Sequence, residues 1–432
     1  MSTLPLQGIR VIDLCIYWAG PMATALLADL GAEVIKIESV QRLDHLRLLG
    51  GWPTPDGYEW SAVFNGTNTN KYGITLNLNH PRGKEIVKRL VETGDIVAEN
   101  FSPRVMENWG LTYDALREIN PQLIMLSMPG FGSTGPWRNY VTFGPNIEMV
   151  SGMPTISGYP DGEPMMTGYF ADPAAGLMGA VAVMIALQYR QRTGKGQHID
   201  LSQTEAITQF MGGAIMDFTM NRRLQPRRGN RHPFFAPHDV YRCKGDDEWV
   251  TITVSSEEEW SGLCDAMGKP AWAQEARFSN NASRYQNQDA LDEFIQSWTG
   301  QRDKGEVMEI MQRAGVAAAA VLTYADVLSD HHLQQRGFFE EVTRPVTGTH
   351  PHAGFPAKFS ETPISIRRPA PTLGQDNEHV LKKLLGMTDE EINELAEEEV
   401  IGTKPHGWPY SMEADEAVSR LKAIHTEDGD SE

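Results

Sequence analysis

The residue of this sequence with the clearest chemical potential is Asp172, which stands at the start of a long apolar run. Pro173 follows it, and every residue from 174 to 187 is apolar or glycine. An Asp-Pro pair is typical of a helix start, because the Asp side chain accepts free backbone amides and Pro fits the first helical position. We therefore predict a helix from Asp172 to about Arg192. Since the run has no polar face, we expect this helix to be buried on all sides.

A carboxylate at the mouth of a buried helix is a candidate nucleophile. Burial raises the pKa of such an Asp, whereas the helix amides and the positive end of the helix hold it down. The expected result is an ionised, partly desolvated carboxylate that can attack an electrophilic carbon. The simpler interpretation is that Asp172 only caps the helix. The local pattern leaves both interpretations open.

Two other motifs resemble known binding sites. Residues 130–135 read Gly-Phe-Gly-Ser-Thr-Gly after a predicted strand, but Pro136 and Trp137 follow where a dinucleotide fingerprint requires a helix. We interpret this segment as a glycine loop beside a ligand. His350 and His352 flank a proline without a nearby cluster of cysteines or carboxylates, so we predict no metal site.

The elements that would position these residues alternate between strand and helix. Helices are expected from Pro21 through Leu30, over 83–93 and over 105–119, between short β-branched runs at 9–14, 32–37, 95–99, 123–128 and 197–201. This alternation predicts an α/β fold with a doubly wound, Rossmann-like parallel sheet. Ligands of such sheets bind beyond the carboxyl ends of the strands. Those ends carry residues 17–19, 38–39, 100–101 and 129–130.

The rest of the chain predicts a second, smaller α+β domain. We place the large domain at 1–200, a linker at 201–225, the small domain at 226–328 and a return to the large domain at 329–400. Residues 330–371 are rich in proline and poor in helical pattern, so they are expected to wrap another surface. Residues 401–432 form an acidic tail that we expect to be partly disordered.

Composition excludes several classes of partner. The 432 residues carry a formal charge of −19, which argues against nucleic acid and against an anionic membrane. The apolar run after Asp172 is also shorter than the roughly 20 residues of a membrane span. Three widely spaced cysteines predict a reducing compartment, and the N-terminal residues have no signal-peptide pattern, so we expect a cytoplasmic protein.

Several segments together resemble one known family. They are Leu-Gln-Gly-Ile-Arg-Val-Ile-Asp-Leu at 6–14, Ala-Gly-Pro at 19–21, Leu-Gly-Ala-Glu-Val-Ile-Lys-Ile-Glu at 30–38, Asn-Lys at 70–71, Gly-Ile-Thr-Leu-Asn-Leu at 73–78, Asp-Ile-Val-Ala-Glu-Asn-Phe at 95–101 and Arg-Thr-Gly-Lys-Gly-Gln at 192–197. In order and spacing they are similar to the class III CoA-transferases, which include formyl-CoA and crotonobetainyl-CoA:carnitine transferases. The resemblance extends over residues 6–400. It favours the nucleophile interpretation, because the family's catalytic aspartate stands where Asp172 stands.

The resemblance implies transfer of CoA from an acyl-CoA to a free carboxylic acid through covalent intermediates on Asp172. Coenzyme A thioesters would be substrates, and no permanently bound cofactor is expected. The residues implied to contact CoA are Trp18 and Ala19 through the backbone, Lys71 and Arg104 at phosphates, and Asn100 and Phe101 at the nucleotide. Each also has a purely structural interpretation, as a core aromatic, a surface charge or a strand-end cap.

The resemblance also implies an interlocked dimer, in which each chain is threaded through the other, by default of two identical chains. A heteromer with a related subunit stays open. So do an acyl-CoA-binding subunit and an acyl-CoA racemase, although residues 143–148 lack the histidine of the racemase pattern.

Departures from the family pattern make specificity for very small acids doubtful. Trp18 replaces a glutamine of some family members, and residues 229–237 replace a glycine-rich lid. We expect succinyl-CoA or a similar short donor, with a larger and partly apolar acceptor, because Trp18, Phe234 and Phe235 offer apolar surface.

Overall fold

The computed structural model describes residues 4–50 and 54–408. Contacts within the chain divide it into two units, which are described separately here. The first contains the described residues up to Ser151, then Thr167–Gly212, and the residues from Arg336 onward; the second contains Gly152–Met166 and Gly213–Gln335. The domain limits expected at 200, 225 and 328 stay predictions, and the segment Gly152–Met166 joins the second unit.

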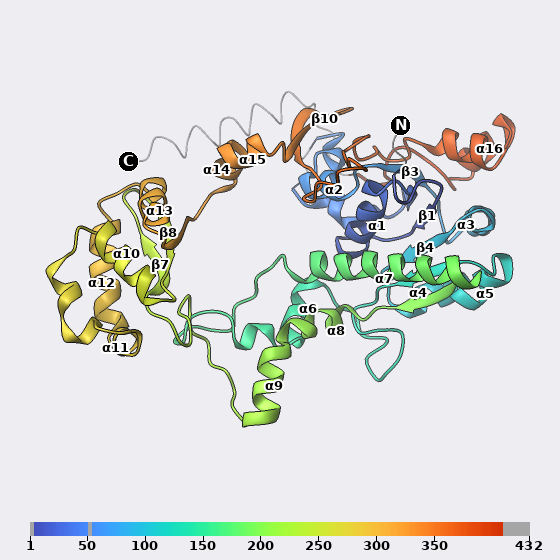
Figure 1. Cartoon of the computed structure of the whole chain (residues 1–432). Coiled ribbons are helices and arrows are strands. Elements are labelled where there is room, and N and C mark those ends of the chain that lie inside the picture. Colours follow the sequence, from blue (N-terminus) through green and yellow to red (C-terminus); the bar gives the residue numbers. More distant parts are fainter. Residues whose placement is uncertain (1–3, 51–53, 409–432) are drawn as a thin grey trace. The chain divides into compact units, whose positions relative to one another are not determined.

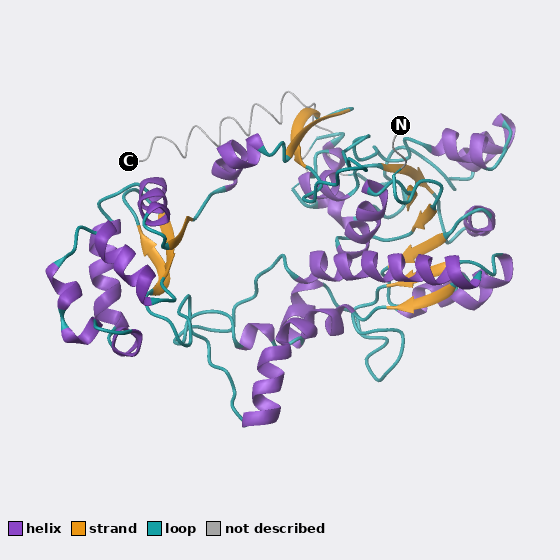
Figure 2. Cartoon of the chain, in the orientation of Figure 1, coloured by secondary structure: helices purple, strands orange, loops and turns teal. Residues whose placement is uncertain are grey.

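A six-stranded parallel sheet forms the centre of the first unit (Figures 1 and 2). The strand order is β3-β2-β1-β4-β5-β6, with bounds β1 Arg10–Asp13, β2 Glu33–Glu38, β3 Lys71–Thr75, β4 Ile96–Glu99, β5 Ile124–Ser127 and β6 Gln197–Asp200. This is the order of a doubly wound Rossmann-like sheet. The predicted fold class is therefore confirmed. The sequence pattern missed only the edge strand β3, whose central glycine weakens the β-strand signal.

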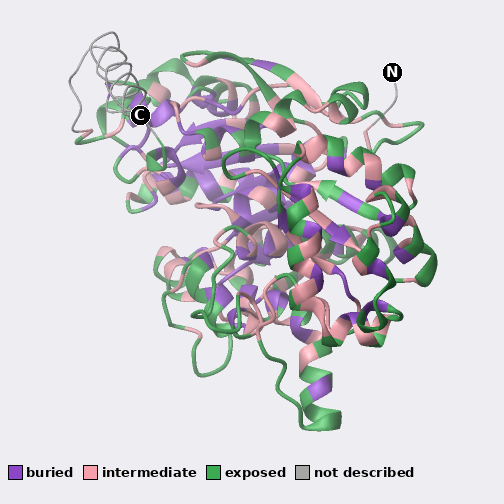
Figure 3. Ribbon diagram, turned by 90° about the vertical axis from the view of Figure 1, so that its left-hand side faces the viewer, coloured by how far each residue is buried: buried purple, intermediate pink, exposed green. Residues whose placement is uncertain are grey.

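Helices cover both faces of this sheet. The helices that pack in the two cores on the sheet are α1 Ala19–Asp29, α3 Pro81–Glu92, α4 Pro103–Trp109, α5 Tyr113–Ile119, α7 Ala171–Thr193, α8 Gln203–Thr208 and α16 Asp389–Glu397. The same unit contains the short helices α2 Ala62–Thr67 and α6 Gly144–Val150. Successive strand residues point to opposite faces. Thus Val11 packs in the core beneath α1 and α7, while Ile12 packs in the core beneath α3 and α5. Figure 3 shows the buried residues concentrated along these strands.

One predicted helix is divided in two. The sequence predicts a single helix over 105–119, but α4 ends at Trp109, and Gly110 after it adopts the left-handed conformation with φ 66°. The next helix, α5, begins after Thr112, whose side chain accepts a hydrogen bond from the backbone N–H of Ala115. A glycine C-cap followed by a threonine N-cap is a local stop-and-start signal that outweighs the continuous apolar pattern.

Helix α7 is buried on one face only, so the expectation of burial on all sides is wrong for the single chain. Small residues let α7 lie close along α1, since a Cβ at Gly176 would come within 2.7 Å of the Ala19 carbonyl oxygen. The opposite stripe is apolar and exposed: Leu177, Val181, Met184, Ile185 and Tyr189. Apolar composition predicts that a helix is covered, but it does not reveal whether the same chain provides the cover.

By length and composition, α7 is also the helix in the described residues that could cross a membrane. That criterion is met equally by core helices, and α7 packs on α1 and the sheet through Ala175, Val183 and Ala186. We therefore interpret it as a core helix. The cytoplasmic location stays a prediction. The three cysteines, Cys15, Cys243 and Cys264, are buried and unpaired.

The second unit is a small α+β structure around a three-stranded antiparallel sheet. The order is β7-β8-β9, with bounds β7 His238–Arg242, β8 Trp249–Thr253 and β9 Ala317–Ala320. Its helices are α9 Gly212–Asn221, α10 Glu257–Ala266, α11 Asn281–Gln286, α12 Gln288–Thr299, α13 Lys304–Arg313, α14 Tyr324–Ser329 and α15 His331–Gln335. Phe234 and Phe235, expected to offer apolar surface to a substrate, belong to this unit.

The returning segment contains more regular structure than the sequence predicts. A hairpin of β10 Phe339–Arg344 and β11 Gly348–Ala353 lies within the stretch expected to be irregular. The chain then packs on the first unit, where Ile401 joins the core and Trp408 Nε1 donates to the Thr54 carbonyl oxygen. Residues 401–408 of the predicted tail are therefore ordered against the fold, and residues 409–432 lie outside the described residues.

Candidate active site

A cavity of about 1240 Å³ lies at the carboxyl ends of the parallel strands, entirely within the first unit. Its wall is contributed by segments that follow all six strands, including Tyr17 and Trp18 after β1, Arg42 after β2, Lys84 after β3, Asn100 and Phe101 after β4, and Pro129 and Gly130 after β5. Gly144 of α6, Asp172 of α7 and, after β6, Gln203 of α8 also line the cavity. The cavity is where a doubly wound sheet binds its ligands.

Asp172 lies in the first turn of α7, inside the helix rather than at its cap. The helix begins at Ala171, and Phe170 occupies the N-cap position without a side-chain hydrogen bond. The predicted start is therefore wrong by one residue, and Asp172 does not cap the helix. Instead its carboxylate accepts a hydrogen bond from the backbone N–H of Ala19. The other side of the carboxylate is open only because residue 144 is glycine, since a Cβ there would overlap Asp172 Oδ2.

The environment of Asp172 raises its pKa to about 6. Burial is the main cause, and the negative charge of Glu148 adds to it, while the hydrogen bond from Ala19 partly opposes both. Near pH 7 the carboxylate is then mostly ionised but more basic than an ordinary Asp. A desolvated and more basic carboxylate is a better nucleophile than one in water.

Glu148 supplies the cap that the sequence assigned to Asp172. Its buried carboxylate accepts hydrogen bonds from the backbone N–H groups of Thr167, Gly168, Phe170 and Ala171, at 2.8, 3.3, 3.2 and 3.3 Å. The Thr167 hydroxyl donates a further bond of 2.8 Å. Burial raises the pKa of Glu148, but these donors outweigh it and hold the pKa below its usual value. Glu148 thus fixes the segment that presents Asp172. No local pattern marked this residue, because its partners lie 19–23 residues further along the chain.

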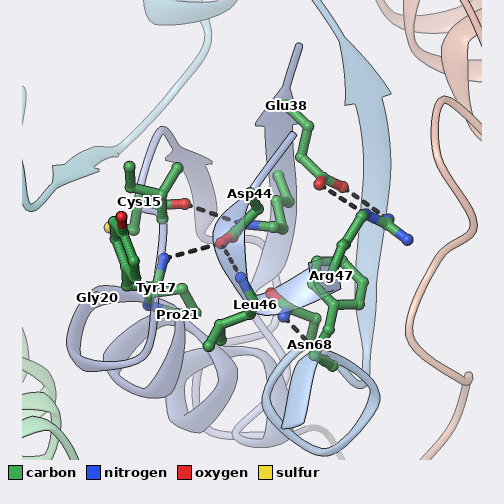
Figure 4. Close-up of polar contacts among 12 residues, drawn as sticks. Cys15, Tyr17, Gly20, Pro21, Glu38, Asp44, Leu46, Arg47 and Asn68 are labelled. Atoms are coloured by element: carbon green, nitrogen blue, oxygen red, sulfur yellow. Dashed lines mark hydrogen bonds and ion pairs between the residues drawn. The ribbon is translucent and has the colours of Figure 1, made fainter. Parts of the chain in front are cut away.

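The loop that contributes Tyr17, Trp18 and Ala19 is held by a buried polar cluster (Figure 4). Asp44 Oδ1 accepts hydrogen bonds from the backbone N–H groups of Tyr17 and Leu46, each 3.0 Å long. Lys36 Nζ donates to Asp44 Oδ2 at 3.1 Å and to the Cys15 carbonyl oxygen at 2.9 Å. These bonds support Tyr17 at a φ of 59°, which is disfavoured for residues with a side chain. The cluster therefore fixes where α1 begins, and with it the Ala19 N–H that faces Asp172.

Aromatic side chains line the cavity near Asp172. The Trp18 and Tyr169 rings meet edge-on with centroids 5.6 Å apart, and Tyr17 meets Phe143 in the same way at 5.2 Å. The predicted apolar surface from Trp18 is thus present in the cavity wall.

Asn100 and Phe101 stand at the carboxyl end of β4, as the sequence predicts. The Asn100 side chain accepts from the Ile16 N–H at 2.9 Å and donates to the Ile16 carbonyl oxygen at 2.7 Å, so it ties two strand-end loops together. The Phe101 N–H donates to Glu99 Oε2 at 2.8 Å, and its ring packs edge-on against Trp109. Both residues line the cavity.

Cationic side chains give the cavity a local character opposite to the net charge of the chain. Arg42, Lys84, Arg104 and Arg138 contribute to its wall. Arg138 pairs with Glu107 at 2.6 Å, whereas Arg42, Lys84 and Arg104 have no ion-pair partner within residues 4–50 and 54–408. The acidic side chains Glu38 and Asp44 of the same wall are paired with Arg47 and Lys36. The three unpaired cations make the cavity suited to an anionic ligand.

Lys71 and Ala19, by contrast, lie outside the cavity wall. Lys71 is fully buried, and its ammonium nitrogen lies within 3.0 Å of Asp13 Oδ2, the Pro21 carbonyl oxygen, Thr24 Oγ1 and Asn68 Oδ1. Since an ammonium group has three donors, this leaves none for the phosphate contact that the sequence suggested for Lys71. Ala19 contributes its N–H to Asp172 instead.

Sequence reasoning also missed residues whose role depends on contacts distant in the chain. Besides Glu148 these are Gly144 and Arg42, neither of which belongs to a recognisable local motif. In the described part of the chain no group of three His, Cys, Asp or Glu residues could hold a metal ion. The expected absence of a metal and of a permanent cofactor stays a prediction.

Comparisons with known proteins agree on one family. The model of CoA-transferase family III matches residues 6–377. The beta subunit of succinyl-CoA–L-malate CoA-transferase from Chloroflexus aurantiacus is 35% identical over 404 residues, which cover 93% of this chain and 99% of that protein. Succinyl-CoA–D-citramalate CoA-transferase from the same organism is 34% identical over 398 residues, or 92% and 98% of the two chains. The crystal structure of a CAIB/BAIF family protein from Brucella suis superimposes with a TM-score of 0.82 at 32% identity, covering 89% of this chain and 100% of that one.

Proposed function

Because the chain belongs to CoA-transferase family III and is a CoA-transferase, we propose that it moves CoA from succinyl-CoA to a free carboxylic acid, with Asp172 as the nucleophile. The proposal rests above all on the placement of the Asp172 carboxylate. It lies in the wall of a large cavity at the strand ends, has the backbone N–H of Ala19 beside it, and has its pKa raised to about 6.

The chemistry proceeds through covalent intermediates on Asp172. An Asp172 carboxylate oxygen attacks the thioester carbon of succinyl-CoA, and the C–S bond breaks to give a mixed anhydride and the CoA thiolate. The thiolate then attacks Cγ of Asp172, which releases succinate and leaves an aspartyl-CoA thioester. The acceptor carboxylate attacks that thioester and expels the thiolate, and the thiolate finally attacks the new acyl carbon to give acyl-CoA and free Asp172. Each step exchanges one acyl bond for another, so no external oxidant or reductant is consumed.

The surroundings of Asp172 are suited to these steps. Burial excludes water that would hydrolyse an anhydride. The Ala19 N–H keeps one carboxylate oxygen in place and is positioned to stabilise negative charge that develops on it as Cγ is attacked. Glu148 keeps the backbone at residues 167–171 fixed, so the nucleophile is held by the packing of α1 and α7 rather than by a mobile loop.

Coenzyme A is proposed to enter along the cationic part of the cavity. Arg42, Lys84 and Arg104, which have no ion-pair partner within the described residues, supply positive charge for its phosphates, and Asn100 and Phe101 line the same cavity at the end of β4. Trp18 offers apolar surface beside the nucleophile. Lys71 is not part of this proposal, because its donors are occupied inside the fold.

Succinyl-CoA is proposed as donor because two relatives, the L-malate and D-citramalate CoA-transferases from Chloroflexus aurantiacus, are named for it.

Trapping of the intermediates tests the proposal directly. The purified enzyme is incubated with succinyl-CoA, quenched, digested and analysed by mass spectrometry for a CoA adduct on the peptide that contains Asp172. Asp172→Asn is the matched variant, since its side-chain oxygen still accepts the Ala19 N–H while the nucleophilic oxygen is lost. We expect the adduct and all CoA transfer to disappear in this variant, with the circular dichroism spectrum retained. Turnover at the wild-type rate in Asp172→Asn would refute the assignment.

For the assembly, we infer an interlocked dimer of two identical chains. The supporting observation is the exposed apolar stripe of α7, which borders a groove of about 680 Å³ formed with Leu26 of α1, with Leu30 directly after α1 and with Phe355. An apolar surface of this kind is typical of a covered interface. A heteromer is the alternative, because one relative is named as a beta subunit.

Expression of this chain alone distinguishes these assemblies. Native mass spectrometry should give a dimer that persists on dilution, and loss of dimer in denaturant should coincide with loss of helical signal, since unthreading requires partial unfolding. A folded monomer at moderate denaturant would contradict the interlock. A dimer that forms only after a second, different chain is added would contradict the homodimer.

A further inference from the structure

An aromatic cluster lines the cavity beside the Asp172 carboxylate. Its members are Tyr17, Trp18, Phe143 and Tyr169. The first two directly precede Ala19, whose backbone N–H bonds Asp172, and the third directly precedes Gly144, which leaves room for Asp172 Oδ2. The fourth stands three residues before Asp172 in the chain. The cluster therefore adjoins the place where the acyl carbon reacts.

A ligand in the cavity can reach these rings. Phe143 is 50% exposed and Tyr169 is 70% exposed, and both belong to the cavity wall. Large apolar side chains with so much exposed surface gain free energy when another apolar group covers them. The free surface of the rings is thus available to a molecule that binds at Asp172.

The rings are held in place by contacts with one another. Tyr17 stacks on His45, with centroids 4.8 Å apart and an interplanar angle of 13°, and it meets Phe143 edge-on. The Trp18 and Tyr169 rings meet at an interplanar angle of 61°. Aromatic pairs prefer such geometries, so the cluster offers a preformed binding surface rather than four independent side chains.

Charge contributes little to holding an acid beside Asp172. The pKa of Asp172 responds to burial, to the Ala19 hydrogen bond and to the negative charge of Glu148, and no cationic side chain of the described residues acts on it. The donor is held through its CoA part, whereas the acceptor enters as a free acid and binds only through its carboxylate and its body. On this side of the cavity, the affinity for the acceptor therefore comes from contact between its body and the rings.

We propose that the aromatic cluster is the binding surface for the acceptor acid, and that the enzyme's acceptors are arylalkanoic acids, in which a short chain joins an aromatic ring to the carboxyl group. Aromatic rings attract one another beyond the area that they bury, so an aryl group gains more from this cluster than a saturated ring of the same size. This inference rests on the proposed CoA-transferase reaction and narrows its acceptor class.

Three acids with the same short chain and different bodies test this role. With succinyl-CoA as donor, kcat/KM is measured for butyrate, 3-cyclohexylpropionate and 3-phenylpropionate. The wild-type enzyme should prefer 3-phenylpropionate to butyrate by roughly tenfold or more, because a hydrophobic pocket discriminates by such factors against a missing apolar group. It should also prefer 3-phenylpropionate to 3-cyclohexylpropionate by about threefold. Equal use of butyrate, or equal or better use of 3-cyclohexylpropionate, would overturn the proposal.

Single substitutions in the cluster test whether these rings cause the preference. Phe143→Leu and Tyr169→Leu should each lower the ratio of kcat/KM for 3-phenylpropionate to that for butyrate, mainly by raising the KM of the aryl acid. Tyr324→Leu is the matched control, since Tyr324 is 94% exposed and lies outside the cavity wall, and it should keep the wild-type ratio. Equal losses with both acids in the cluster variants would assign the rings to the positioning of Asp172 and overturn the proposal. A ratio that stays unchanged in both cluster variants would overturn it as well.

A binding measurement separates this inference from the reaction itself. Isothermal titration of 3-phenylpropionate and of butyrate into the enzyme with CoA bound should give tighter binding of 3-phenylpropionate in the wild type and a smaller preference in Tyr169→Leu. The dissociation constant of CoA should stay the same in this variant. The measurement needs no turnover, so it decides the role of the cluster even if Asp172 proves not to be the nucleophile. Equal affinity for the two acids in the wild type would refute the proposal, and weakened CoA binding in Tyr169→Leu would assign the rings to CoA instead.

Discussion

Replacing Gly144 by alanine should move the Asp172 carboxylate while leaving the rest of the site in place. A Cβ at residue 144 would overlap Asp172 Oδ2 and lie 3.2 Å from its Cγ. To regain an ordinary van der Waals separation, the carboxylate must swing away by about 1 Å. Such a side-chain rotation costs on the order of 0.5–1.5 kcal/mol. Since Gly144 does not have a positive φ, its backbone accepts alanine and the fold should persist.

The kinetic cost should be much larger than the cost in stability. Misplacing a reacting group by about 1 Å lowers the rate by on the order of 10²-fold, which corresponds to about 2.7 kcal/mol in the activation free energy. The assay is exchange of label between succinyl-CoA and isotopically labelled succinate. We expect kcat and kcat/KM to fall together, because the lost interaction belongs to the transition state, while the dissociation constant of CoA changes by less than about twofold.

A second glycine provides the control. In α2, a Cβ at Gly66 would meet no atom within 4 Å. Gly66→Ala should therefore leave exchange unchanged and stabilise the helix by about 0.5–1 kcal/mol. Wild-type exchange in Gly144→Ala would show that the Asp172 carboxylate does not need its present position. Loss of CoA affinity in proportion to the loss of rate would show that the substitution disturbs more than the nucleophile.

Three further predictions concern buried charges. The kcat/KM of CoA transfer should fall below about pH 6, because Asp172 becomes protonated there. In Glu148→Gln this acidic limb of the pH profile should move to lower pH, because the charge of Glu148 contributes to the raised pKa of Asp172. An acidic limb that stays in place or moves to higher pH contradicts this prediction. Burial raises the pKa of Glu99 to about 7, so its contribution to the unfolding free energy is present below about pH 4.5 and is lost as pH rises through 7. The substitution Glu99→Gln should remove up to about 3 kcal/mol of this pH dependence, measured by urea unfolding at several pH values. Parallel curves of unfolding free energy against pH for the wild type and the variant would contradict the prediction. Lys71→Met should lower the unfolding free energy by about 3–5 kcal/mol, because it leaves Asp13 buried without its partner. The double variant Lys71→Met/Asp13→Asn should recover part of this loss. If Lys71→Met instead keeps normal stability but binds CoA more weakly, Lys71 contacts a CoA phosphate.

Local patterns in the sequence determined the fold class and the place of the candidate site. Short β-branched runs between helical segments predict a parallel sheet, and parallel strands bring their carboxyl ends to one edge. That rule alone brings Trp18, Asn100 and Phe101 into one cavity. The Asp-Pro pair before an all-apolar run identified Asp172, because an acidic residue beside so much buried surface is chemically unusual.

Other features were decided only by the tertiary structure, because they depend on contacts between residues far apart in the chain. Local sequence encodes hydrogen bonds over a few residues, and on that basis it assigned the cap of α7 to Asp172. The structure gives the cap to Glu148, whose partners become neighbours only when α6 folds against the start of α7.

Lys71 illustrates the same limit for charge. In the sequence it is a lysine at the start of a weak strand, free to contact a phosphate, and in the fold its partner Asp13 is 58 positions away. Burial next to a distant carboxylate, not residue type, decides whether a lysine binds a ligand or stabilises a core. The unpaired oxygen of Gln203 and the exposed stripe of α7 likewise follow from what the folded chain leaves unsatisfied. Which polar atoms lack a hydrogen-bond partner and which apolar surfaces stay exposed depends on how all the elements pack together. A local sequence pattern therefore does not predict either feature.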